Sequence, residues 1–104
     1  MDLLLNNSVF DWVKKQNEAS RKELSAGLAM LEKAAKDGNP RALGRPISTS
    51  PVIYEMRAGA LRILYLVQEE RSGDEVTFVL AIRHRHEAPS VPGFPSEEMA
   101  NEQA

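Results

Sequence analysis

Apolar and polar positions alternate from Val52 to Ile82, in three apolar-rich runs that two turn signals separate. A period of two is typical of β-strands with one buried face. The first turn signal contains Gly59, and the second is Ser72-Gly73-Asp74. Glycine in such short loops is typical of hairpins. The pattern therefore predicts a three-stranded antiparallel meander.

Turn geometry sets the register of the first predicted hairpin. A loop at Ala58-Gly59, or a longer one from Arg57 to Ala60, pairs Glu55 with Arg62. The face we expect against the core then contains Val52, Tyr54, Met56, Leu61, Ile63, Tyr65 and Val67, with Val76, Phe78, Leu80 and Ile82 from the last run. The opposite face gathers Glu55, Arg57, Arg62, Leu64, Leu66, Val79, Ala81, Arg83 and Arg85.

The first 40 residues carry helical signals instead. Ser8 is a predicted N-cap, and apolar residues recur with helical spacing from Leu24 to Ala35. The spacing lapses from Gln16 to Glu23, so Asn17 to Ser20 is either a turn between two helices or the solvated middle of one helix. We favour the turn, since a hairpin of helices places both apolar stripes on one sheet. Gly38 and Pro40 then end the helical part.

These patterns predict an α+β fold, with an N-terminal helical hairpin packed on a small antiparallel β-sheet. We expect residues 1–87 to form one domain and the proline-rich residues 88–104 to form a flexible tail. Asp2 to Leu5 is either a short first strand or a disordered lead-in. Arg41 to Pro51, with three Gly and Pro breakers, is predicted to be a solvated connector.

Composition narrows the class of protein. The chain has no cysteine, so we expect a reducing compartment, the cytoplasm. No run approaches the roughly 20 apolar residues that a membrane-spanning helix needs. The net charge of −2 argues mildly against affinity based on phosphate neutralisation alone. All basic residues after Lys36 are arginines, which suit bidentate contacts with phosphate or carboxylate.

The arginine-bearing sheet face is the predicted binding surface. It combines apolar residues with cations, as a surface that a partner covers does. Its candidate binding residues are Arg57, Arg62, Leu64, Leu66, Val79, Arg83 and Arg85. The alternative is an ordinary solvated face on which Glu55 pairs with Arg62.

His84 and His86 are the only histidines of the chain. Two imidazoles without cysteine are too few for a zinc site, so no metal and no cofactor is expected. Histidine is a common proton carrier in enzymes, so both side chains are candidates for proton transfer, or they are simply polar residues at a strand end.

Two segments resemble the bacterial RelE/ParE toxins of type II toxin-antitoxin systems: YEMRAGALRILY at residues 54–65, and LAIRHRHEA at residues 80–88. The resemblance implies a helical hairpin with a meander, and an antitoxin that wraps the toxin. It also implies that Arg62 contacts a scissile phosphate and that Arg85 stabilises developing charge in the nucleases of the family. The chain departs from those nucleases, because Ile47 to Ser50 contains no lysine and Ser90 and Val91 stand where a tyrosine is expected.

Three hypotheses of function follow. The first is a toxin similar to ParE, which inhibits growth by binding DNA gyrase, since the ending IRHRHEA resembles that group more closely. The second is a ribosome-dependent mRNA endonuclease, or mRNA interferase, that uses Arg62 and Arg85 with His84 or His86 as catalytic residues. The third is a non-toxic protein-binding module. The expected partners are a cognate antitoxin, in a homo- or hetero-oligomer, and gyrase or the ribosome with its mRNA, and no membrane.

Overall fold

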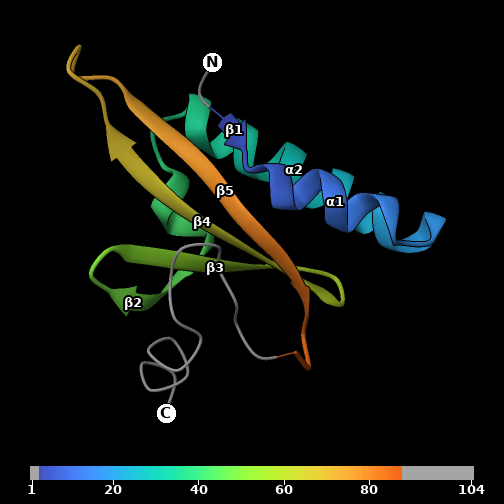
Figure 1. The fold of residues 1–104 in the computed structure, drawn as a ribbon. Coiled ribbons are helices and arrows are strands. Elements are labelled where there is room, and N and C mark those ends of the chain that lie inside the picture. The colour runs from blue at the N-terminus through green and yellow to red at the C-terminus, as the bar shows by residue number, and fades with distance from the viewer. Residues whose placement is uncertain (1–2, 88–104) are drawn as a thin grey trace.

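The computed structural model describes residues 3–87 (Figure 1). A short strand comes first, the helices follow it, and the remaining strands come last. The elements, in chain order, are β1 (Leu3–Leu5), α1 (Asn7–Lys14), α2 (Glu18–Lys36), the 3-10 helix η1 (Pro40–Leu43), β2 (Arg45–Thr49), β3 (Val52–Ala58), β4 (Leu61–Glu69) and β5 (Glu75–His84). The predicted flexible tail at residues 88–104 lies outside the described residues.

The strands of this described part form one five-stranded mixed sheet in the order β1-β5-β4-β3-β2. β1 runs parallel to β5, while every other neighbouring pair is antiparallel. The molecule is thus α+β, but the prediction of an initial helical hairpin on an antiparallel sheet is wrong. β1 pairs with the last strand of the described part, with every other element between them in the chain, and a three-residue strand leaves too short a pattern to reveal this.

Asparagine side chains cap both helices. Asn6 Oδ1 accepts a hydrogen bond from Ser8 N at 3.0 Å, and Asn17 Oδ1 accepts one from Ser20 N at 2.8 Å. Asn6, rather than the predicted Ser8, is therefore the N-cap of α1. The hydroxyl of Ser8 instead donates to the carbonyl of Leu80 at 2.6 Å, which ties α1 to β5.

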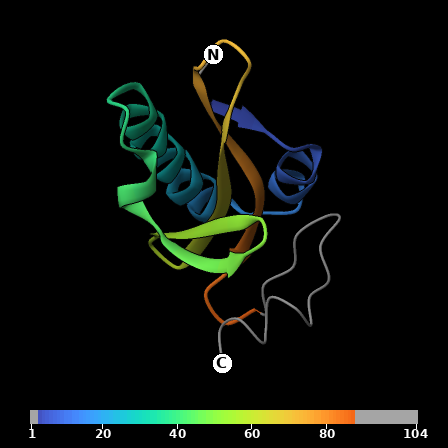
Figure 2. The ribbon, with the colours of Figure 1, turned by 90° about the vertical axis from the view of Figure 1, so that its left-hand side faces the viewer.

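The two helices cover one face of the sheet at different places. α1 packs mainly against β5, while α2 packs against β3, β4, β1 and η1. In the view of Figure 2, α2 lies to the left of β4 and β5, and α1 lies to their right. Gly27 lets α2 approach β3 closely, because a Cβ built there would lie 2.7 Å from Ala58 Cβ. The predicted apolar stripe contributes Leu24 and Leu31, which are buried.

The main core lies between the helices and the sheet. Its buried members are Leu3, Val9, Leu24, Leu31, Met56, Ala58, Leu61, Ile63, Tyr65, Val79 and Ile82. Tyr65 is fully buried, and its hydroxyl donates to the carbonyl of Pro40 at 2.7 Å. Its ring stacks on Tyr54 at 5.6 Å between centroids. Tyr65 thus joins the sheet to η1 from within the core.

A second apolar cluster lies on the other face and consists of buried Ile47, Ile53, Leu64, Leu66, Leu80 and Ala81. Ile47 belongs to β2, which pairs with β3, so the prediction of a solvated connector at Arg41 to Pro51 is wrong for this part. The pattern there is short and interrupted by Pro46, which hides the strand.

The observed registers correct two predictions. Ala58 pairs with Leu61 and Arg57 with Arg62, so the tight turn falls at Gly59-Ala60 and Glu55 faces Leu64 instead of Arg62. This difference keeps the faces of β3 and β4, because side chains alternate with a period of two.

In β5 the register shifts, since Leu64 pairs with Ala81 whereas Tyr65 pairs with Val79, which leaves Leu80 as the extra residue of a bulge. Val79 therefore lies in the main core, while Phe78 and Leu80 pack in the second cluster, opposite to the predicted faces.

Replacing Gly27 with alanine is expected to destabilise the fold. The added methyl group meets Ala58 Cβ at 2.7 Å and Ile63 Cδ1 at 2.8 Å. Overpacking of this kind costs about 1–3 kcal/mol, against a gain of about 1 kcal/mol in helix propensity. Urea unfolding should thus show a net loss of about 1 kcal/mol. The exposed position Ser25 provides the control, since Ser25→Ala on the same helix should leave stability equal or slightly higher.

We expect the folded protein to lose stability at alkaline pH because of the buried hydroxyl of Tyr65. Burial raises its pKa from 10.0 to about 12, so the folded protein holds a proton that the unfolded chain releases. The contribution of this proton to the free energy of unfolding is fully present below pH 10. It falls by about 2 kcal/mol as the pH rises towards 12. Tyr65→Phe should cost about 1 kcal/mol at neutral pH through the lost hydrogen bond, and should flatten the alkaline fall. An equally steep fall in Tyr65→Phe would assign the effect to other groups.

Candidate anion-binding site

Three arginines lie side by side across neighbouring strands. Arg57 of β3 pairs with Arg62 of β4, and Arg62 pairs in turn with Arg83 of β5. We call Arg57, Arg62 and Arg83 the arginine row. Directly opposed side chains start only about 5 Å apart at Cβ, and like charges in this position repel. The arrangement therefore needs negative charge nearby, from the protein or from a ligand.

Glu55 neutralises one end of the arginine row. Its carboxylate accepts from Arg83 at 2.5 Å, and the two side chains are only 4% and 9% exposed. The other carboxylate oxygen lies 3.5 Å from the guanidinium of Arg45. Arg83 also donates to the backbone carbonyls of His84, Arg85 and Glu87. The guanidinium of Arg83 is thus fully engaged inside the molecule, where it fixes the segment that follows β5.

Arg62 has no such carboxylate partner within residues 3–87. Its guanidinium donates to the carbonyls of Leu61 at 2.8 Å and Gly59 at 3.2 Å. Burial lowers the pKa of Arg62, and the neighbouring cations Arg57, Arg83 and Arg85 add to this against the opposing effect of Glu55. Arg57 and Arg85 are exposed, and neither has an ion pair in the described part of the chain. Arg57, Arg62 and Arg85 thus form a cationic surface that suits a phosphate or carboxylate group.

The apolar members of the predicted surface are not accessible. Leu64 is fully buried and Leu66 is 8% exposed, both in the second cluster, while Val79 is fully buried in the main core. Ile47 and Ile53 pack with Leu64 and Leu66, so β2 and β3 help to cover the strip that we expected to be open. The exposed part of the predicted surface consists of arginines.

The histidines lie on the other side of the sheet from Arg62. His84 pairs with Leu61, a core residue, and its ring lies 5.7 Å from that of Trp12 on α1. The ring of His86 stacks on His84 at 5.8 Å. Leu61 and Arg62 are successive strand residues and point to opposite faces. The structure therefore does not bring the imidazoles and Arg62 together on one face.

Glu23 of α2 is a residue of this region that the sequence did not reveal. Its carboxylate accepts from Ala60 N at 2.7 Å, at the turn between β3 and β4. Arg85 N donates to Ala60 O at 2.9 Å, so the turn is also tied to the end of β5. Glu23 falls where the helical spacing lapses, and nothing in a local pattern links it to a turn 37 residues away.

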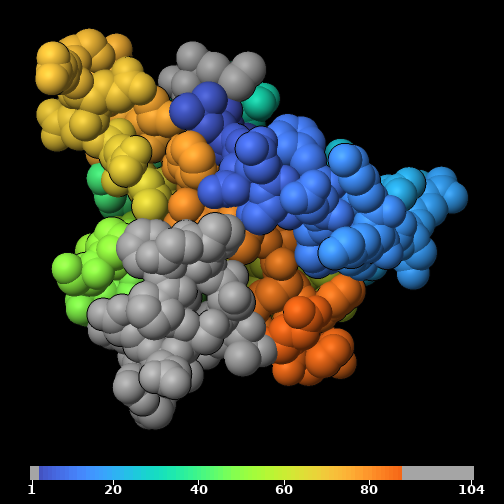
Figure 3. All heavy atoms as spheres, in the orientation of Figure 1, coloured from blue at the N-terminus to red at the C-terminus, as the bar shows by residue number. Residues whose placement is uncertain are grey.

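The cationic Arg85 lies far from the acidic residues Glu70 and Asp74 at the turn between β4 and β5 (Figure 3). The turn between β4 and β5, in yellow, projects at one corner of Figure 3, and the last described residues, in orange, lie at the opposite corner. In residues 3–87 no group of three or more His, Asp or Glu side chains could hold a metal ion. Neither helix in this part combines the length and apolar character needed to cross a membrane.

No protein-family model matches the sequence, and a search among curated proteins finds no match either. The resemblance to RelE/ParE toxins thus depends on the residues quoted above.

Removing the Glu55 carboxylate is expected to destabilise the fold severely. In Glu55→Gln, Arg83 stays buried without its anion, and breaking such a pair costs about 3–5 kcal/mol. The matched control is Arg57→Gln on the same strand, which removes an exposed cation and should change stability by less than about 0.5 kcal/mol. Urea unfolding of both variants measures the difference. Equal stabilities of the two variants would contradict a structural role for the buried pair.

Proposed function

We propose that this chain is the toxin of a type II toxin-antitoxin pair, of the ParE kind, and that it inhibits growth by binding DNA gyrase. The observation that carries the proposal is the arginine row with its uncompensated members. The two segments that resemble the family, residues 54–65 and 80–88, provide all three arginines of the row. They come together at one end of the sheet, next to Arg85.

The arrangement of the histidines favours a binding protein over a nuclease. Cleavage of RNA at Arg62 requires a proton carrier within hydrogen-bond reach of the reacting groups. His84 and His86, the two predicted carriers, lie on the face of the sheet that carries Trp12 of α1. The cations of the opposite face suit tight, oriented binding of an anionic surface without proton transfer.

The proposed partner in the uninhibited cell is an antitoxin with acidic side chains that neutralise Arg57 and Arg62. Hydrogen bonds to charged groups contribute about 1.5–3 kcal/mol each, so a few contacts at this surface give specific binding. The proposal places the protein in the cytoplasm, where gyrase and its DNA substrate are found.

The test combines growth with gyrase activity. Induced wild-type protein should slow growth, and the purified protein should inhibit DNA supercoiling by gyrase. The double variant Arg57→Gln/Arg62→Gln should lose at least about tenfold in inhibitory potency, because two charged contacts disappear. Arg71→Gln, an exposed arginine on the turn between β4 and β5, serves as the control and should retain full potency. Urea unfolding confirms that each variant is folded.

Two outcomes would overturn the proposal. Unchanged supercoiling together with cuts in translated mRNA that vanish in Arg85→Ala would identify an endonuclease. Normal growth at high expression, with no effect on gyrase, would indicate a non-toxic binding module.

A further inference from the structure

β3 and β4 are paired along only part of their length. Their register ends at Tyr54 and Tyr65, although β4 continues to Glu69. Val52 and Ile53, the residues of β3 before Tyr54, pair with β2 on the opposite edge of β3 and have no partner on β4. Within the described part of the chain, residues 66–69 of β4 therefore pair only with β5. The other edge of this segment presents backbone N–H and C=O groups without a strand to receive them.

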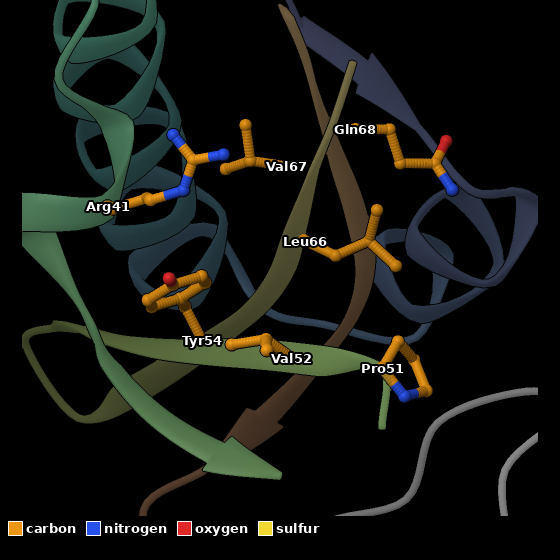
Figure 4. Close-up of a pocket in the computed structure, with 7 residues that line it drawn as sticks. All are labelled: Arg41, Pro51, Val52, Tyr54, Leu66, Val67 and Gln68. Carbon is orange, nitrogen blue, oxygen red and sulfur yellow. The ribbon is translucent and has the colours of Figure 1, made fainter. Parts of the chain in front are cut away.

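A cavity of about 270 Å³ lies at this separation (Figure 4). Val52, Tyr54, Leu66 and Val67 supply most of its apolar lining, and Arg41 and Gln68 supply polar groups. Val52 is 43% exposed, which is high for a large apolar side chain. The cavity is slightly smaller than the roughly 300–1,000 Å³ of typical small-molecule sites, so it suits an anchoring side chain.

The cavity walls are held in place before any ligand binds. Tyr54 stacks on the buried ring of Tyr65 at 5.6 Å. Arg41 donates to Glu75 at 2.6 Å, and this hydrogen bond raises the pKa of Arg41 and lowers that of Glu75. A preformed site loses little conformational entropy on binding.

The charges around the open edge are mainly acidic. Glu69, Glu70, Asp74 and Glu75 are all exposed on the arm formed by the ends of β4 and β5, and only Arg71 opposes them there. Arg41, the cation of the cavity, is already paired with Glu75. A segment that lies along this edge therefore gains most from basic side chains.

We propose that the open edge of β4 at residues 66–69 and the adjoining cavity form a strand-addition site for an extended, basic peptide segment of a partner protein. The backbone of the segment pairs with β4, one apolar side chain fills the cavity beside Val52 and Tyr54, and flanking lysines or arginines meet the acidic arm. This site is at the other end of β3 from Arg57, and it does not depend on the proposed toxin activity.

The test uses a short capped peptide of alternating valine and lysine, followed by NMR of the isotope-labelled full chain. Saturable shifts should appear at the amides of residues 66–69, with slowed hydrogen exchange at those whose N–H points away from β5. The same peptide with a central proline, which lacks one N–H donor, should bind about tenfold more weakly. A valine–glutamate peptide should show little binding.

Two variants, at positions where the wild-type side chains are similarly exposed, complete the design. Val52→Arg fills the cavity with a cation and should weaken binding by at least about tenfold. Leu4→Arg, at a position that is 41% exposed on β1, should bind like the wild type. Shifts that centre on Arg57 and Arg62, equal effects of the two variants, equal binding of the acidic peptide, or no saturable shifts would each overturn the proposal.

Discussion

The buried pair of Glu55 and Arg83 is the interaction on which the arginine-bearing end of the sheet depends. It joins β3 to β5 across β4, and Arg83 also holds three carbonyls of the segment after β5. Burying two charges is costly unless further interactions satisfy them, and here three carbonyls accept hydrogen bonds from Arg83 while Arg45 forms a second ion pair with Glu55. One carboxylate thus fixes both the strand ends and the position from which Arg85 emerges.

The same carboxylate determines which arginines remain available. Because Glu55 engages Arg83, it offsets only part of the repulsion on Arg62, whose pKa is lowered by burial and by its cationic neighbours. An anionic ligand would relieve this repulsion, which is the physical argument for the binding surface that we propose. The overall net charge of −2 hides this local excess, because acidic residues elsewhere in the chain, four of them on the distant arm of β4 and β5, offset it.

Local patterns predicted much of the sheet and little of its connections. Alternation correctly gave the core face of β3 and β4 along residues 54–67, but it wrongly included Val52, which is exposed; it also placed Arg57, Arg62 and Arg83 on one face. The bulge at Leu80 reverses the faces before it, and no residue type marks it. The contact of Glu23 with the turn at Ala60 depends on how α2 packs, which the sequence around Glu23 does not encode. Long-range contacts of this kind also decided the parallel pairing of β1.

The separation of β3 from β4 follows from the way the second apolar cluster is buried. The helices cover only one face, so Leu64 and Leu66 on the other face need different cover. Ile47 of β2 and Ile53 of β3 provide part of it, which requires the β2–β3 end of the sheet to curl over β4. Pairing between β3 and β4 then cannot continue past Tyr54 and Tyr65. Burying the second cluster in this way thus leaves an open strand edge beside a cavity.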